Sequence, residues 1–238
     1  MPDYNYKEFS SGEYDLNASA GPQVGDKAPD FLLRDSLGQP RRLLDFKGDF
    51  LVLEIGSITC PLFQTRRPLM EALGKQGHNI ENAVLYVREA HPGADIPAHG
   101  TLADKVACAR RLTGEDGESR LVLVDDLDGA AHRAYGGLPN SVFVINRNGC
   151  VVFRSDWNDP RATTAALDAL STGRPLRGRS YFRPAHPSVA LRTLRRAGSG
   201  SGRDFLRSFP NLVWNNLIRR NLRTLLGRPT VTSADMVC

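Results

Sequence analysis

Short runs of apolar residues alternate along the chain with segments in which apolar positions recur every three to four residues. The short runs are typical of buried strands, and the periodic segments are typical of helices that bury one face. Thr101 followed by Asp104 is an N-cap pattern, and Arg147-Asn148-Gly149 is a hairpin signal. The pattern predicts strands at residues 50–55, 83–88, 121–125, 141–146 and 150–155, and helices at 61–76, 101–112, 130–135 and 160–170.

The order of these elements predicts an α/β fold. Alternating strands and helices, followed by a hairpin and a closing helix, build a central mixed sheet flanked by helices. This order suits a thioredoxin-like fold. We expect a flexible leader at residues 1–22, because this segment is polar and rich in Ser, Gly and Asn, and a folded domain at 23–173.

The charge distribution sets residues 174–238 apart as an Arg-rich C-terminal extension. Residues 1–173 hold 18 Lys and Arg against 24 Asp and Glu, whereas residues 174–238 hold 13 Arg against two Asp. We expect a flexible Gly-Ser linker at 198–202 and a basic amphipathic helix at 211–226.

Such a basic extension fits three kinds of partner. Residues 203–228 are the expected contact with an anionic membrane surface, or with a protein, which includes the acidic domain and a second copy in a homodimer. Nucleic acid is the third kind and ranks last, because the chain carries no recognised nucleic-acid motif.

The N-terminus lacks the basic and apolar regions of a secretory signal, and no apolar run reaches the about 18 residues of a membrane span. We therefore expect a cytoplasmic protein that could contact a membrane only peripherally. The four cysteines show no close pairing, so neither a CxxC redox pair nor a zinc cluster is visible, and a disulfide is not expected. Cys108 is predicted to fill the core, with a resolving cysteine as the alternative. Cys150 is predicted to be structural, and Cys238 a passive end residue, with an approach of Cys238 to Cys60 as the alternative.

Cys60 stands where a predicted buried strand turns into a predicted helix. Unpaired N–H groups and the dipole at a helix N-terminus stabilise an anion, so we expect a thiol with a lowered pKa. Pro61 suits the first helical turn, and the hydroxyls of Ser57 and Thr59 could bind the thiolate. The alternative is a buried structural cysteine.

The segment around Cys60 resembles the active-site stretch of the iodothyronine deiodinases, in which selenocysteine takes the place of Cys60. A second motif, residues 86–91 with the sequence Tyr-Val-Arg-Glu-Ala-His, is similar to the family's Tyr-Ile-Glu-Glu-Ala-His. His99 lies near the family's second histidine. The similarity extends over roughly residues 24 to 172, and the two motifs together are fairly specific.

The resemblance implies a thiol-dependent oxidoreductase that acts on a small-molecule substrate. Cys60 would attack a halogen or a peroxide oxygen, and His91 would supply a proton while Glu89, or another carboxylate, orients its imidazole. His99 would help to bind the substrate. The alternative for both histidines is a pair of solvated loop residues. Pro139 would take the place of the cis-proline of thioredoxin-like proteins, with an ordinary trans bond as the alternative. No metal or organic cofactor is implied, and an external thiol or a thioredoxin-type reductant would regenerate Cys60.

Two alternatives stay open. One is a peroxiredoxin-like thiol peroxidase, although the PxxxTxxC spacing of ordinary peroxiredoxins is absent before Cys60. The other is a non-catalytic, redox-sensitive adaptor that is tethered by its basic tail. The pKa of Cys60 separates enzyme from adaptor, because a value near or below neutral favours an enzyme and a value above about 8.5 favours an adaptor.

Overall fold

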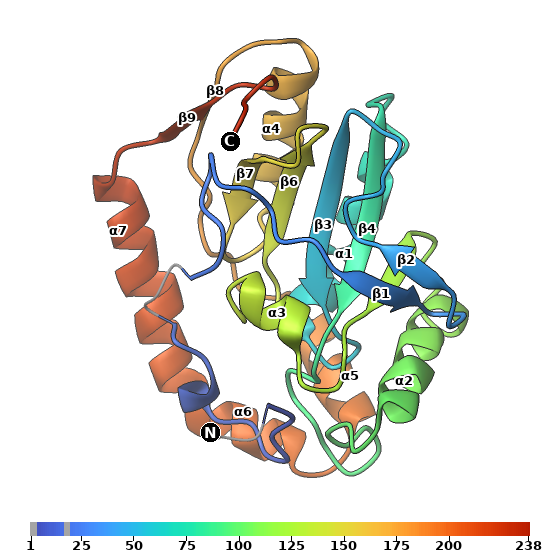
Figure 1. Ribbon diagram of the computed structural model, residues 1–238. Coiled ribbons are helices and arrows are strands. Elements are labelled where there is room, and N and C mark those ends of the chain that lie inside the picture. Colours follow the sequence, from blue (N-terminus) through green and yellow to red (C-terminus); the bar gives the residue numbers. More distant parts are fainter. Residues whose placement is uncertain (1–3, 17–19) are drawn as a thin grey trace.

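The computed structural model describes residues 4–16 and 20–238 and arranges them around a seven-stranded sheet (Figure 1). The strand order is β2-β1-β5-β4-β3-β6-β7. The three strands β3, β4 and β5 pair in parallel, and the other neighbours pair antiparallel. The strands of this mixed sheet are β1 Leu32–Asp35, β2 Pro40–Arg42, β3 Phe50–Gly56, β4 Ile80–Tyr86, β5 Leu121–Val124, β6 Val142–Asn146 and β7 Val151–Ser155.

Helices cover both faces of the sheet, as the sequence predicts. Apolar residues of α1, α2 and α4 pack on one face, and those of α3 pack on the other. The expected capping box is present, since Thr101 Oγ1 accepts a hydrogen bond from the N–H of Asp104, whose carboxylate accepts one from the N–H of Thr101. The helices are α1 Pro61–Leu73, α2 Leu102–Gly114, α3 Ala130–Ala134 and α4 Pro160–Ser171.

The strands β1 and β2 are absent from the sequence prediction. Every side chain of β2 is exposed, and β1 alternates between exposed and buried positions. Because these short strands bury few side chains, they leave no apolar run in the sequence for a pattern to detect.

The leader is packed rather than loose over residues 4–16, so the prediction of a flexible leader is wrong there. Its large side chains are buried against the domain, and Arg88 holds three of them. The Arg88 guanidinium lies 4.7–5.0 Å from the ring centroids of Tyr4, Tyr6 and Tyr14, and it donates hydrogen bonds to the carbonyl oxygens of Tyr4 and Glu13. Aromatic burial and cation–π contacts outweigh the entropy of ordering this polar segment. The buried apolar residues of the segment are Tyr4, Tyr6, Phe9, Tyr14 and Leu16.

The C-terminal extension is also folded onto the domain, and it runs around the outside of the sheet (Figure 1). No flexible linker separates its first two helices. The carbonyl oxygen of Ala197 accepts hydrogen bonds from the N–H groups of Asp95 and Ile96, and that of Ser199 accepts one from Ala94. The elements of the extension are β8 Leu176–Gly178, α5 Pro187–Ala197, α6 Ser201–Leu212, the π-helix η2 Val213–Arg220, α7 Asn221–Leu226 and β9 Thr230–Thr232.

A disulfide joins the end of the chain to the β6–β7 hairpin, between Cys150 and Cys238. The expectation of no disulfide, with Cys238 as a passive end residue, is therefore wrong. The two cysteines are 88 positions apart, so their pairing depends on the tertiary path of the extension and leaves no local signal. Asn146 Nδ2 strengthens the attachment by donating to the carbonyl oxygens of Ala234 and Met236, at 2.9 and 2.8 Å.

Candidate active site around Cys60

Cys60 caps the N-terminus of α1 at the end of the central strand β3, as predicted. Its Sγ accepts a hydrogen bond from the N–H of Phe63 at 3.5 Å, and Pro61 occupies the first turn of the helix. The tight approach of strand and helix requires glycine at the end of β3, because a Cβ on Gly56 would lie 2.2 Å from the Phe63 ring. The local sequence thus fixes where the thiol sits.

The pKa of the Cys60 thiol is raised to about 11 rather than lowered as predicted. Burial is the main cause, since only 2% of the residue is exposed and a buried thiolate loses its hydration. The N–H groups of Phe63 and Leu62 and the charge of Arg66 act in the opposite direction, but they do not compensate for the burial. The predicted helix-start effect exists and is outweighed.

Arg66, one turn further along α1, is a buried cation near the thiol that the sequence analysis missed. It donates a hydrogen bond to Asn140 Oδ1 at 2.7 Å and another to the carbonyl oxygen of Arg183. Burial lowers the pKa of its guanidinium to about 10. Below that value Arg66 remains charged and would favour a thiolate at Cys60.

A buried ionic cluster lies behind Arg66. Arg120 binds Glu54 and Glu118, each at 2.7 Å, and the side chain of Asn140 donates to Glu54 at 3.0 Å. This cluster was also missed, although a glutamate in the otherwise apolar run of residues 50–55 was a visible signal of it. Because breaking such a cluster leaves an uncompensated buried charge, it holds β3 and the loop before β6 in place.

Glu89 binds His99 rather than His91, which corrects the predicted role of this carboxylate. His99 Nε2 lies 3.1 Å from Glu89 Oε1, and Glu89 also accepts hydrogen bonds from the N–H and Oγ1 of Thr59 and from the Tyr86 hydroxyl. Burial alone would raise the pKa of Glu89, but these hydrogen bonds outweigh it and lower the pKa. Glu89 is therefore an anion that ties His99 to the residue before Cys60.

His91 lies beside the same turn but is enclosed by aromatic rings. Its backbone N–H donates to Thr59 Oγ1 at 3.2 Å, and its ring centroid is 4.1 Å from that of Phe9 and 5.4 Å from that of Phe205. Its Nδ1 is buried and makes no hydrogen bond in the described structure. Burial lowers the pKa of His91 to about 3, so the imidazole is neutral at pH 7 and is not the cationic acid that was predicted.

Ser57 and Pro139 shape the surroundings of Cys60 in ways that differ from prediction. The Ser57 hydroxyl accepts the N–H of Ala90, and that of Thr59 is engaged with Glu89, so both join the Cys60 turn to the Glu89 segment instead of binding the thiol. The bond before Pro139 is trans, since no cis peptide bond occurs among the described residues. The trans bond places Asn140 where it binds Arg66 and the backbone of Ile55.

The leader and α6 close the site. Tyr6 donates to the carbonyl oxygen of Ala90 at 2.8 Å, and its hydroxyl lies 2.6 Å from that of Tyr14. Burial raises the pKa of both phenols, and negative charge on Cys60 would raise it further. Leu62, two residues after Cys60, packs against the same group of aromatic residues. We call this layer the aromatic cover. Its members are Tyr6, Phe9 and Tyr14 from the leader and Phe205 from α6.

Cys108 lies on α2, only partly buried, at one corner of a set of possible metal ligands. The ligand atoms of Glu89, His99 and Cys108 lie within 4.8 Å of one another. Both oxygens of Glu89 already accept hydrogen bonds, so a metal ion would have to displace Thr59 or Tyr86. Burial raises the pKa of Cys108 to about 12, so its thiol is protonated at pH 7.

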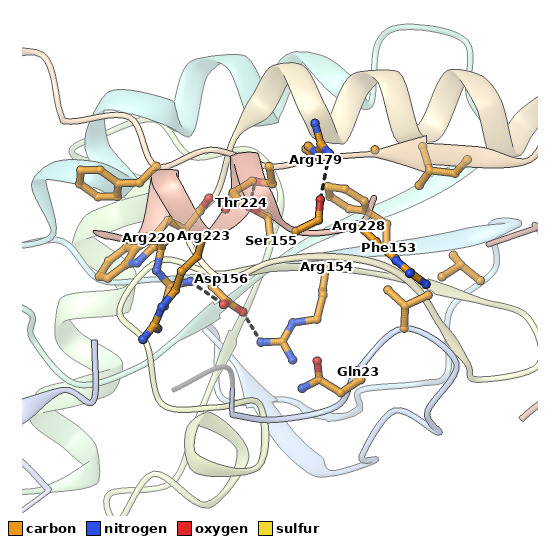
Figure 2. Close-up of a pocket in the computed structure, with 18 residues that line it drawn as sticks. Gln23, Phe153, Arg154, Ser155, Asp156, Arg179, Arg220, Arg223, Thr224 and Arg228 are labelled. Atoms are coloured by element: carbon orange, nitrogen blue, oxygen red, sulfur yellow. Dashed lines mark hydrogen bonds and ion pairs between the residues drawn. The ribbon is translucent and has the colours of Figure 1, made fainter. Parts of the chain in front are cut away.

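A cavity of about 480 Å³ lies elsewhere, between β7 and the C-terminal extension (Figure 2). Asp156 binds Arg154 from β7 and Arg220 from η2 across it, and Arg179 donates to the carbonyl oxygen of Gly227 (Figure 2). None of the predicted site residues lines this cavity. It is therefore separate from the candidate active site.

Comparisons with known proteins agree with the fold. The chain is similar to an uncharacterized conserved protein from Geobacillus kaustophilus (22% identity, TM-score 0.51, 64% of this chain and 84% of that chain). It is also similar to a hypothetical protein from Sinorhizobium meliloti 1021 (20% identity, TM-score 0.52, 65% and 87%) and to a thiol peroxidase from Chromobacterium violaceum (16% identity, TM-score 0.46, 63% and 88%). No curated protein matches the chain.

The family model of iodothyronine deiodinase matches residues 9–157, well over half of the chain. The match spans the Cys60 turn, the Glu89 segment and two of the four residues of the aromatic cover, Phe9 and Tyr14. The predicted thioredoxin-like fold is confirmed. The chain therefore belongs to the iodothyronine deiodinase family, and its function is thiol-dependent redox chemistry.

Proposed function

We propose that Cys60 is the nucleophile of a thiol-dependent reductase that acts on a carbon–halogen bond. The observation that carries the proposal is the position of Cys60 as N-cap of α1, with its sulfur on the N–H of Phe63 and with Arg66 nearby. These groups favour the thiolate as soon as water reaches the sulfur. Cys60 is the only described free cysteine that caps a helix, since Cys108 lies inside α2.

In the proposed reaction the Cys60 sulfur bonds to the halogen, the carbon–halogen bond breaks, and the carbon takes a proton. The carbon gains two electrons, and the sulfur is oxidised to a sulfenyl halide. An external thiol then displaces halide and forms a mixed disulfide with Cys60. A second thiol releases the Cys60 thiol and leaves as part of a disulfide, so two external thiols supply the two electrons.

The closed arrangement is a resting state in this proposal. With a pKa of about 11, roughly one Cys60 in ten thousand is a thiolate at pH 7. Displacement of the aromatic cover would hydrate both Cys60 and His91. Hydration lowers the pKa of a buried thiol and raises that of a buried imidazole, so one movement would create both the thiolate and a histidine able to donate a proton.

The alternative of a non-catalytic adaptor has one observation in its favour. A thiol pKa of about 11 is the value expected of an unreactive, buried cysteine. The adaptor and the enzyme differ in whether the cover opens when substrate and reductant are present.

Turnover measurements test the proposal. Iodinated aromatic compounds and, separately, peroxides are offered to the full chain with glutathione as reductant, and halide release or peroxide loss is followed. We expect halide release that Cys60→Ser abolishes and that the matched variant Cys108→Ser retains. Turnover of peroxides alone would identify the thiol peroxidase, and no turnover of either class would favour the adaptor. Activity that survives in Cys60→Ser would remove Cys60 as the nucleophile.

A further inference from the structure

The helical segment Ser201–Leu226, formed by α6, η2 and α7, turns its apolar side chains to solvent. Eight large apolar residues on it are between 40% and 78% exposed. Soluble proteins scatter single apolar residues over their surface, but a continuous row of this size marks a contact surface. We call it the outer row, and its members are Leu206, Phe209, Trp214, Leu217, Ile218, Leu222, Leu225 and Leu226.

The opposite side of the segment, which faces the protein, is largely polar, apart from Phe205 in the aromatic cover and Leu212, which packs against the leader cluster. Ser201 donates to the carbonyl oxygen of Leu194 at 2.7 Å, and Ser208 accepts the N–H of Ser11 at 3.2 Å. The buried polar residues of this side are Ser201, Asp204, Ser208, Asn215 and Asn216. An ordinary surface helix buries its apolar stripe and exposes its polar face. Here most of the buried residues are polar and eight large apolar residues are exposed, so the domain does not supply an apolar partner for the outer row.

The exposed charges within residues 203–228 themselves are all positive. Arg203, Arg207 and Arg228 are exposed, as are two further arginines on η2 and α7. The one acidic residue within 203–228, Asp204, is 4% exposed. A surface of this kind attracts an anionic partner over a Debye length of about 10 Å at 0.1 M salt.

We propose that the outer row binds an anionic lipid membrane, with the Ser201–Leu226 segment lying in the plane of the interface. No described helix is long and apolar enough to cross a membrane. The 26 residues of the segment amount to about 40 Å of helical path, which changes direction between α6 and α7 (Figure 1). Its leucines enter the acyl boundary, Trp214 sits at headgroup level, and the arginines contact lipid phosphates.

The charge pattern favours a membrane over a second copy of the chain. A twofold dimer through the outer row would place the same arginines opposite one another, and like charges across an interface disfavour association. An anionic lipid surface meets both features at once, because it offers an apolar layer under a layer of negative charge.

Vesicle sedimentation with the full, disulfide-bonded chain tests this proposal. The probes are vesicles of phosphatidylcholine alone and of phosphatidylcholine mixed with phosphatidylglycerol. We expect binding to the mixed vesicles that weakens with salt, and at least tenfold weaker binding for Trp214→Ser combined with Leu222→Ser. The matched control, Leu32→Ser combined with Leu37→Ser, removes two leucines that are 70% and 74% exposed on and just after β1, and should bind like the wild type.

Fluorescence supplies an independent readout, because the chain has two tryptophans and Trp157 is buried. Mixed vesicles should shift the emission of Trp214 to shorter wavelength. No binding to mixed vesicles at low salt, or equal binding by the outer-row and control variants, would overturn the proposal. A dimer in solution that Trp214→Ser with Leu222→Ser abolishes, together with no vesicle binding, would assign the row to a second copy instead.

Discussion

Removal of the Phe9 ring should expose Cys60 without unfolding the domain. Phe9 is 6% exposed and packs on His91, Tyr6 and Tyr14, so it is central to the aromatic cover. Replacing a buried phenylalanine by alanine removes about 3 kcal/mol or more of packing. If the lost packing lowers the free energy of local opening of the leader by this amount, the fraction of molecules with an open leader rises about a hundredfold. The reason is that 1.4 kcal/mol corresponds to a factor of ten in an equilibrium constant.

The assay is alkylation of Cys60 by iodoacetamide, followed by mass spectrometry in a Cys108→Ser background. With a pKa of about 11, the wild type at pH 7 has about 300-fold less thiolate than a free thiol of pKa about 8.5. The alkylation rate of the wild type should rise about tenfold per pH unit up to pH 10, because the fraction of Cys60 that is a thiolate rises by the same factor.

In Phe9→Ala we expect alkylation at pH 7 to be about a hundredfold faster and to level off at lower pH. The matched control is Phe153→Ala, which removes an equally buried ring from β7, where it packs in a cluster with α4 and is not part of the aromatic cover. If Phe9→Ala reacts no faster than Phe153→Ala, or if the wild-type rate already levels off near pH 7, the reasoning about the closed site is refuted.

Three further predictions concern stability. Because burial lowers the pKa of His91 and His132 to about 3, the unfolded chain binds protons below pH 6.5 that the folded chain does not. The unfolding free energy measured with urea should therefore fall by about 1.4 kcal/mol per pH unit for each histidine as pH drops from 6.5 towards 3, and a flat profile would contradict their neutral burial. Reduction of the disulfide should lower stability by about 4–5 kcal/mol in the chain-entropy model, seen as a lower melting temperature that Cys150→Ser with Cys238→Ser reproduces. Arg120→Leu leaves two buried glutamates uncompensated, so denaturant unfolding should show a loss of about 3–5 kcal/mol, whereas a change below about 1 kcal/mol would mean that the cluster is hydrated.

Local features of the site were predictable from the sequence, because they depend on neighbours within a few positions. The helix that starts after Cys60 and the cap at Thr101 with Asp104 are of this kind. The parallel strands and the hairpin were visible for the same reason, as short apolar runs with turn signals between them. These features suffice for a thioredoxin-like fold and a thiol at a helix start.

Features that depend on burial by distant segments were not predictable in this way. The thiol pKa was predicted in the wrong direction, because the folded chain buries Cys60 and removes its water, which no local sequence pattern reveals. Glu89 was predicted to bind His91, which is the nearer histidine in the sequence. In the structure the ring of His91 packs on Phe9, and Glu89 binds His99 instead. The leader resembled a loose segment because its aromatic residues alternate with polar ones, and their burial depends on contacts with Arg88 and His91, far along the chain.

The covalent link between Cys150 and Cys238 affects how the chain responds to proteolysis. It closes a ring that contains α4 and the whole C-terminal extension, including exposed arginines such as Arg179 after β8. A protease that cuts once after Arg179 would leave the two fragments joined, and they would migrate as one band until a reductant is added. In an oxidising environment a nicked molecule therefore keeps its outer row, whereas in a reducing one only non-covalent packing retains the extension. The redox state of the surroundings thus decides how long a cleaved molecule keeps the surface that we propose for membrane binding.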